Sequence, residues 1–462
     1  MSNISEPTII LSESAKDNAA AKLHRQLKRR LFSGGGWALG GRVGGMALGL
    51  LIQMALARLL APEAMGIYFL AASFAGFIGL FNQLGTGLGV VRETTSALTN
   101  EAPGNIRPLF QIYLLAVLAV SSVVLLLLSV DEIGNALSRS FGAPSLAALL
   151  PWIGVWGGAL ALQTLISGVH RGFHDIPKAT WYAGLFSNLL LSALLLIVYG
   201  YTAAIELSVV VAVTIISVII SVIVGAASFY WRTRQFNSAK DVGTVLSLRS
   251  AFPFWFNELL SFSMTQADLW VVGIFCSPTE LAIYGAVTRL TQFVTLPVIL
   301  VEAVVPSMMV EMHVKKSLEP LEKLLRQSTT LVTLPALLLV LVFATAGQPL
   351  LGWVYGGAYS EGALILFLLG LGKLMIVATG PCGYALLMTG HARDVFRVNF
   401  YGGLITVPIA IWAGYAWGGL GVAVVVSTSY SLRALAALWL THKRLGIWTH
   451  VYLPRLAWIF ST

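Results

Sequence analysis

FSGGGWALGGRVGGMALGLLIQMALARLLAPEAMGIY, residues 32–68, is the stretch from which the fold of this chain can be predicted. Its first 26 residues carry one formal charge, Arg42, and a helix of that length crosses a bilayer at 1.5 Å of rise per residue. Eight of those residues are glycines, several of them four positions apart, which predicts close packing against another helix. A short turn around Pro62 follows, and a second apolar run begins near Ile67.

The turn after this first apolar segment is repeated later in the chain. Residues 278–284, PTELAIY, match residues 62–68, PEAMGIY, at an offset of 216, and they also follow a long apolar segment. The same offset relates Arg42 to Glu258, so two halves would present opposite charges at matching depths. We therefore predict an internal duplication.

Composition predicts a membrane protein. The chain of 462 residues is 57% hydrophobic and only 11% charged, which is more apolar surface than a soluble protein can bury. The net charge of +9 would suit a nucleic-acid partner, but the positions of the charges follow membrane topology instead, and we expect no such partner.

Cys276 and Cys382 lie far apart and indicate neither a disulfide framework nor a metal site. No cleavable signal peptide is expected, because the first 31 residues are polar and the next apolar run is too long.

Apolar runs of about 20 residues predict twelve membrane spans. They lie near residues 32–57, 66–90, 108–130, 145–168, 179–199, 207–230, 250–276, 282–306, 327–347, 362–388, 398–416 and 419–440. With both termini in the cytoplasm, 23 of the 29 Lys and Arg residues fall on the inner side, two fall outside and four lie within spans. This asymmetry agrees with the positive-inside rule. The loops near 131–144 and 348–361 are then outside.

The predicted fold is an all-α integral membrane protein with two six-helix lobes. An even number of spans in each half means that both halves enter the membrane in the same direction, with a central cleft between them. The predicted parts are a basic cytoplasmic tail (1–31), an N-terminal lobe (32–230), an inter-lobe loop (231–249), a C-terminal lobe (250–440) and a second cytoplasmic tail (441–462).

Charged residues inside the spans are the candidate functional groups, because each costs about 2.5–3.5 kcal/mol at the bilayer centre. The charged set is Arg42, Glu258, Asp268, Arg289, Glu302, Lys373 and Arg433, and the nearby uncharged polar residues are Gln53, Asn82, Gln83, Asn257 and Gln266. Glu302 and Arg433 are predicted near the cytoplasmic ends of their spans, where their side chains can snorkel to water.

Three interpretations of the remaining charges stay open. Internal ion pairs such as Arg42 with Glu258 would fix helix packing. A proton or cation site would use Asp268 and Glu258. An anion site in a wet cleft would use Arg42, Arg289 and Lys373, with Gln53, Asn257 and Glu258 beside them.

The sequence gives no sign of enzymatic chemistry. We find no cluster with metal-ligand spacing and no Ser-His-Asp set on a soluble loop. The longest predicted outer loops have about 14 residues, too few to hold a sugar donor as polytopic glycosyltransferases do. A carrier without a cofactor or metal is therefore expected.

Four motifs resemble the polysaccharide-transporter family, the flippases of lipid-linked oligosaccharides. Residues 57–68, ARLLAPEAMGIY, resemble the turn between the first two helices of that family, and residues 266–273, QADLWVVG, resemble its counterpart in the second half. Residues 357–362, GAYSEG, resemble the outer loop before the tenth helix, and residues 171–173, RGF, resemble an inner-loop signature.

The resemblance implies a fold and a mechanism. The superfamily, which includes multidrug antiporters and the peptidoglycan-precursor flippase, consists of V-shaped bundles of two six-helix lobes. An undecaprenyl-diphosphate oligosaccharide would cross the cytoplasmic membrane of a bacterium by alternating access, for O-antigen, capsule or exopolysaccharide synthesis. The peptidoglycan-precursor flippases usually have two further helices, which this chain lacks. The polymerase and chain-length machinery of the same pathway would be partners.

A cation-coupled drug or metabolite antiporter is the alternative, with Asp268 and Glu258 as the coupling groups.

Overall fold

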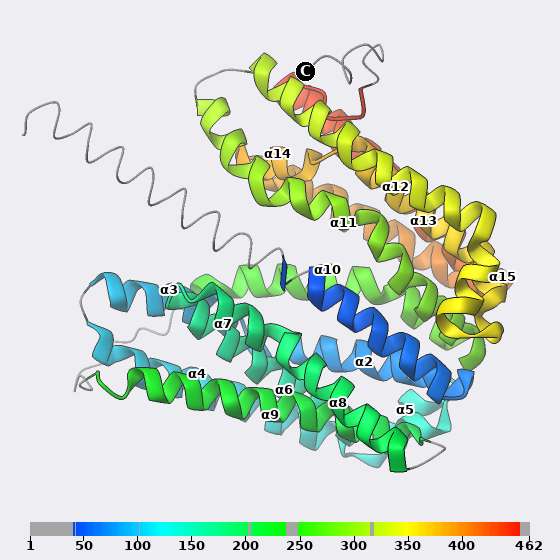
Figure 1. Ribbon diagram of the computed structural model, residues 1–462. Helices are drawn as coiled ribbons and strands as arrows, with labels where there is room; N and C mark the ends of the chain where they lie inside the picture. Colours follow the sequence, from blue (N-terminus) through cyan, green and yellow to red (C-terminus); the bar gives the residue numbers. More distant parts are fainter. Residues whose placement is uncertain are drawn as a thin grey trace, which may run out of the picture.

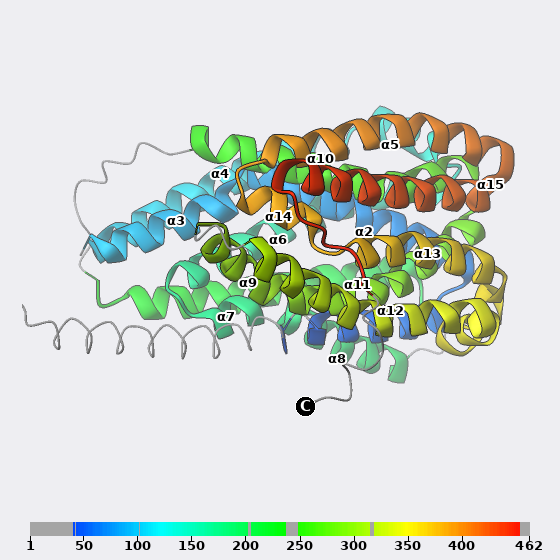
Figure 2. The ribbon, with the colours of Figure 1, turned by 90° about the horizontal axis from the view of Figure 1, so that it is seen from above.

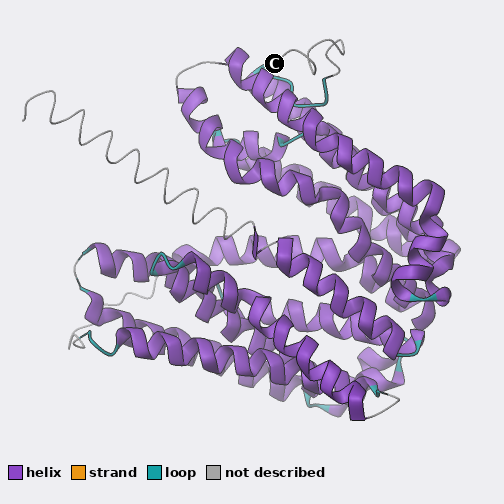
Figure 3. Cartoon of the chain, viewed as in Figure 1, coloured by secondary structure: helices purple, strands orange, loops and turns teal. Residues whose placement is uncertain are grey.

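Helices form almost all of the computed structural model, which describes residues 40–41, 43–100, 102–201, 205–236, 248–314 and 318–452. No strand occurs within these ranges (Figure 3). The apolar runs explain this outcome, because a chain in lipid must satisfy every backbone N–H and C=O within its own segment. The fold class predicted from the sequence is confirmed.

The N-terminal half of the described chain forms one bundle, shown in blue to green in Figure 1. Its first helix spans Val43–Leu59. The others are α2 (Pro62–Gln83), α3 (Thr86–Thr99), α4 (Ile106–Leu128), α5 (Asp131–Ser140), α6 (Pro144–Gly172), α7 (Ile176–Thr180), the π-helical turn η2 (Trp181–Leu185), α8 (Phe186–Tyr201) and α9 (Leu207–Thr233), with a 3₁₀ turn, η1 (Pro103–Asn105), before α4. We call this bundle the N-lobe.

The second half forms the C-lobe, shown in green to red in Figure 1. It consists of α10 (Leu248–Phe275), α11 (Pro278–Val314), α12 (Leu318–Tyr355), the 3₁₀ turn η3 (Gly357–Gly362), α13 (Ala363–Thr379), α14 (Cys382–Met388) and α15 (Ala392–Leu445). Helix α15 is a hairpin rather than one rod, because Gly418 has φ +62° and reverses the chain. The turn predicted at residues 417–418 is confirmed.

The two lobes converge at one end and diverge toward the other, which gives the molecule its V shape (Figure 1). The converging end, called the closed end here, holds the first turns of α2 and α11, and the other is called the open end. Thr279 Oγ1 donates to Glu63 Oε1 at 2.9 Å across this end, and the two residues are 216 positions apart. The two copies of the predicted repeat therefore contact each other at the closed end.

Close backbone approach at the closed end requires glycine. A Cβ on Gly66 of α2 would overlap the carbonyl oxygen of Pro278, the first residue of α11. A Cβ on Gly285 of α11 would meet the ring of Phe69. The Arg58 guanidinium adds a hydrogen bond to the carbonyl oxygen of Trp353. These contacts hold the first turns of α2 and α11 together at this end.

Helix α10 belongs to the C-lobe in sequence but packs on both lobes. Trp255 Nε1 donates to the Leu80 carbonyl oxygen at 2.9 Å, and Trp270 Nε1 donates to Ser73 Oγ at 2.9 Å. The Trp270 ring also stacks on Phe74, with 5.9 Å between ring centroids. Seen from above, α10 runs beside the α15 hairpin (Figure 2).

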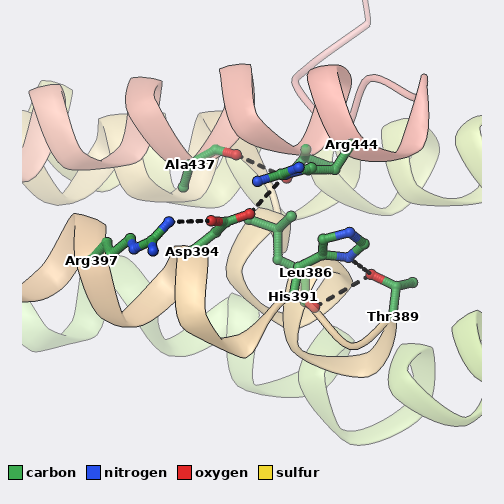
Figure 4. A network of polar contacts seen from close by, with 8 residues as sticks. Leu386, Thr389, His391, Asp394, Arg397, Ala437 and Arg444 are labelled. Carbon is green, nitrogen blue, oxygen red and sulfur yellow. Dashed lines mark hydrogen bonds and ion pairs between the residues drawn. The ribbon is translucent and has the colours of Figure 1, made fainter.

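Polar contacts close both ends of the α15 hairpin. Glu280 Oε1 accepts from the Gly419 N–H at 2.7 Å and so caps the second arm beside the turn. At the other end, Asp394 accepts from Arg444 Nε at 2.8 Å and lies 3.6 Å from Arg397 (Figure 4). These contacts fix the positions of the two arms of the hairpin relative to each other.

Some predicted boundaries were wrong. The span predicted at 66–90 is broken, because Leu84 and Gly85 have positive φ (46° and 79°) and separate α2 from α3. The segment 131–144, predicted as a loop, contains helix α5, which lies against α6. Likewise, much of 348–361 belongs to α12 and η3.

Eight helices among the described residues are long and apolar enough to cross a membrane. The chain is thus a multi-pass membrane protein, whereas the count of twelve spans stays a prediction. The predicted glycine packing is seen at Gly41 and Gly45, where an added Cβ would contact Thr180 or Leu185. Gly44 faces open space instead.

The segment after α15 is held on the C-lobe by a partly buried histidine. Arg326 Nη2 lies 3.4 Å from His450 Nε2, which accepts a hydrogen bond only in its neutral form. Thr449 Oγ1 donates to the Thr379 carbonyl oxygen at 2.7 Å, and the Val451 N–H donates to that of Ala378 at 3.0 Å. These bonds attach the segment to the last residues of α13.

Acidification should loosen this segment. Burial and then the charge of Arg326 lower the pKa of His450 from 6.5, against an opposing effect of Glu322. Because the neutral form is favoured, this stabilisation is present above the ordinary histidine pKa and is lost as the pH falls below it. The protection of the Val451 amide, measured as its exchange rate relative to the intrinsic chemical rate at each pH, should therefore fall between about pH 7.5 and about pH 5.5. His450→Gln should show no such fall, and an equal loss of protection in both proteins would contradict the assignment.

Candidate functional site

Three helices of the C-lobe, α10, α11 and α13, bring a carboxylate and its partners together inside the lobe. Asp268 of α10 accepts from Tyr284 Oη of α11, with 3.2 Å between that oxygen and Oδ2. Its other oxygen, Oδ1, accepts from the Leu269 N–H at 2.8 Å. A carboxylate with two donors is fixed in position, so Asp268 can orient the charges around it.

Two cations face this carboxylate without a direct ion pair. Arg289 of α11 lies within electrostatic range of Asp268, and also of Tyr68 in the N-lobe and Tyr355 in α12. Lys373 of α13 likewise interacts with Asp268, and its Nζ lies 5.6 Å from the centre of the Tyr430 ring. In the described part of the chain, neither cation has an ion-pair partner within 4.0 Å. Both cations therefore lack a direct counter-ion among the described residues.

A pocket joins these groups. It is lined by polar groups of α10, α11, α13 and α15, and by Phe69 of the N-lobe. The polar lining residues are Thr265, Gln266, Asp268, Thr288, Arg289, Thr291, Gln292, Lys373 and Tyr430. Its volume of about 40 Å³ admits a few water molecules in this conformation. A larger ligand needs the lobes to move.

Arg289 and Lys373 lie at similar distances from the starts of their helices. Arg289 is eleven residues from the start of α11, and Lys373 is ten residues from the start of α13. At 1.5 Å per residue each lies about 15 Å along its helix, which is half the length needed to cross a hydrocarbon core of about 30 Å.

A third cation also lies near Tyr430. The guanidinium carbon of Arg433 is 5.3 Å from the Tyr430 ring centre, and its Nε is buried without a hydrogen-bond partner in the described structure. Arg433, Asp268 and Tyr430 line a second, smaller pocket of about 20 Å³ between α10 and α15. The hydroxyls of Thr406 and Ser429, 2.5 Å apart, also line it.

Among the sequence-predicted site residues, only Asp268, Arg289 and Lys373 come together. Asn257 and Glu258 are exposed on α10, about three turns away from Asp268. Gln53 of the first helix is partly buried, and its Oε1 has no partner among the described residues. Arg42 lies outside the described residues, as does the side chain of Glu302, so the Arg42–Glu258 pair remains a prediction.

Arg433 lies farther from the end of its helix than the sequence predicted. The last span was placed at 419–440, but the helix continues to Leu445, so Arg433 is twelve residues, or about 18 Å, from its end, and its snorkelling to the cytoplasmic surface stays a prediction. Sequence reasoning also missed Tyr284 and Tyr430. The signal available was the spacing of Tyr430 and Arg433 by three residues, which places them on one helix face.

The charge balance of the cluster favours an anion. Three cations, Arg289, Lys373 and Arg433, accompany the single carboxylate of Asp268. Burying unpaired charge is costly, so an excess of positive charge is stabilised by an anionic ligand. Arginine suits phosphate because its planar guanidinium donates two parallel hydrogen bonds. The described residues contain no group of three or more His, Cys, Asp or Glu side chains that could hold a metal ion.

Comparison with known proteins gives a family for the chain. The model of a family described as "Polysaccharide biosynthesis protein" matches residues 31–313. No curated protein matches the sequence.

Solved structures give the fold. The inward-facing conformation of a multidrug resistance MATE family transporter of the MOP superfamily aligns with a TM-score of 0.72 at 15% identity, over 87% of this chain and 94% of that one. The outward-facing conformation of such a transporter aligns with a TM-score of 0.62 at 14% identity, over 91% and 96%. A MOP superfamily transporter from Pyrococcus furiosus, whose binding pocket of reverse polarity suggests a different function, aligns with a TM-score of 0.63 at 14% identity, over 91% and 96%.

Proposed function

The chain belongs to the polysaccharide biosynthesis protein family, and from that membership we propose that it is a flippase for lipid-linked oligosaccharides. Its substrate would be an undecaprenyl-diphosphate oligosaccharide that crosses a bacterial cytoplasmic membrane for O-antigen, capsule or exopolysaccharide synthesis. The protein would be a carrier and not an enzyme. The supporting observation is the mid-membrane cluster of three cations around one carboxylate.

The chemistry of a diphosphate fits this cluster. Its negative charges need cationic partners inside a low-dielectric region, and Arg289 and Lys373 have no ion-pair partner in the described chain. The oligosaccharide head group would pass between the lobes while the polyprenyl tail stays in lipid. Outward movement of an anion is also favoured by an inside-negative potential, by about 2.3 kcal/mol per charge per 100 mV.

Alternating access would move the head group. With both termini in the cytoplasm, the open end faces inward and the closed end faces outward. The higher similarity to an inward-facing than to an outward-facing neighbour, with TM-scores of 0.72 and 0.62, supports an inward-open state. Opening outward would then require the contacts between α2 and α11 to separate.

A cation-coupled drug or metabolite antiporter is the second candidate. The fold neighbours named as multidrug resistance transporters and the membrane-embedded carboxylate of Asp268 favour it. A cationic drug would, however, meet a cluster with an excess of positive charge. The flippase is therefore the better explanation of the site.

Deletion of the gene separates the two functions. Loss of a flippase should leave lipid-linked repeat units on the inner side of the membrane and remove the surface polysaccharide. Loss of an antiporter should sensitise the cells to cationic compounds and leave the glycan intact. Mass spectrometry of the polyprenyl-linked pool together with a surface-glycan stain gives the answer, and an unchanged lipid-linked pool would overturn the proposal.

A further inference from the structure

Asp268 lines two different pockets of the C-lobe. In the larger pocket it shares the lining with Arg289 and Lys373, and in the smaller one with Arg433. Tyr430 lines both pockets, and its ring centre lies 5.6 Å from Lys373 Nζ and 5.3 Å from the guanidinium carbon of Arg433. One carboxylate thus shares its two pockets with three cations, and in the described chain it forms an ion pair within 4.0 Å with none of them.

Arg433 has an unused donor in the smaller pocket. Its Nε is buried and lacks a partner, which is an unfavourable state for a charged group. The neighbouring hydroxyls of Thr406 and Ser429 bond to each other rather than to Arg433. The volume of about 20 Å³ is enough for one water molecule between Arg433 and Asp268. Asp268 of α10 and Arg433 of α15 thus line the same small space.

The carboxylate and an incoming phosphate compete for the same cations. Asp268 carries the only negative charge among the described groups that line the larger pocket. A phosphate bound to Arg289 and Lys373 would bring like charge next to it, and repulsion between like charges is strong away from water. The bonds from Tyr284 and from the Leu269 N–H hold Asp268 in its present position, so a turn of the carboxylate has to break the bond from Tyr284.

We propose that Asp268 is a displaceable internal counter-ion of the anion site and that Arg433 is the positioning residue that receives it. This inference rests on the proposed function, because it assumes that the larger pocket takes the diphosphate. Without substrate, Asp268 balances Arg289 and Lys373. When a diphosphate binds, the carboxylate turns toward Arg433 in the smaller pocket. Since Arg433 lies on α15 and Asp268 on α10, the new pairing ties substrate binding to the packing of these two helices.

A double-mutant cycle with inorganic pyrophosphate tests the proposal. Binding is measured calorimetrically on the purified full-length protein and on Asp268→Asn, Arg433→Gln and the double variant. Asp268→Asn removes the carboxylate that competes with pyrophosphate for the cations. Pyrophosphate affinity should therefore rise about tenfold, a typical size for the coupling between two sites. Arg433→Gln should weaken binding about tenfold in the presence of Asp268 but less than about twofold in the Asp268→Asn protein. Arg433→Lys should restore part of the affinity.

The controls separate this switch from other roles. Arg397→Gln, which removes a surface cation of the same lobe, should leave pyrophosphate affinity unchanged. Equal weakening by Arg433→Gln in both backgrounds would show that Arg433 binds the anion itself or only supports the fold, and would overturn the switch alone. If pyrophosphate fails to bind, or if Arg289→Gln leaves its affinity unchanged, the anion site itself is refuted and the switch with it.

Discussion

Replacing Arg289 or Lys373 by glutamine is expected to abolish most polysaccharide export while the protein still reaches the membrane in normal amount. Each cation would donate charge-assisted hydrogen bonds to phosphate, worth roughly 1.5–3 kcal/mol apiece. Losing one should reduce transport by about tenfold to a hundredfold, and losing both should leave almost none. Surface polysaccharide in complemented deletion cells gives the measurement.

Arg326→Gln provides a matched control for this pair of variants. Arg326 is also a partly buried arginine of the C-lobe, but it is paired with Glu322 at 3.2 Å, one turn away on α12. Export should remain near the wild-type level in this variant. Normal export by Arg289→Gln, or an equal loss in Arg326→Gln, would show that the cations of the cluster have no specific role.

Gly66→Ala is expected to stop transport by preventing the closed end from forming. The new methyl group would overlap the Pro278 carbonyl oxygen, and a backbone atom cannot turn aside as a side chain can. The helix itself tolerates alanine, which is the better helix former. The lobes should therefore separate at this end while each keeps its fold.

Spin labels can follow this separation directly. Labels on cysteines at Asn135 of α5 and Glu361 of η3, with Cys276 and Cys382 replaced by serine, report the distance between the lobes at the closed end. Gly66→Ala should shift the distances to larger values. Gly134→Ala is the matched control, because its Cβ would meet its nearest neighbour, Ala147 Cβ, at an ordinary 3.7 Å. Unchanged distances in Gly66→Ala would refute the role given to this contact.

Much of the fold could be predicted because lipid imposes strict rules on sequence. Long apolar runs indicate the helices, and the 216-residue repeat indicates two lobes. The break at Leu84 and Gly85 was missed because apolarity continues through it. The helix at Asp131–Ser140 was missed because it is short and polar on one face, so a search for spans does not detect it.

The candidate site was only partly predictable. Asp268, Arg289 and Lys373 could be selected because charge inside a span is rare. Which of them meet depends on how α10, α11 and α13 pack, and the spacing along the chain does not contain that information. The distance of Arg433 from the end of its helix was underestimated because that end was placed too early.

Transport of a lipid-linked oligosaccharide by the purified protein tests the central claim most directly. The full-length chain is reconstituted into liposomes that contain an undecaprenyl-diphosphate oligosaccharide with a fluorescent sugar, and an impermeant quencher reports how much label faces outward. Wild-type protein should speed equilibration of the label across the membrane, and Arg289→Gln with Lys373→Gln should not. If wild-type liposomes equilibrate no faster than protein-free liposomes, or if the double variant matches the wild type, the account is contradicted.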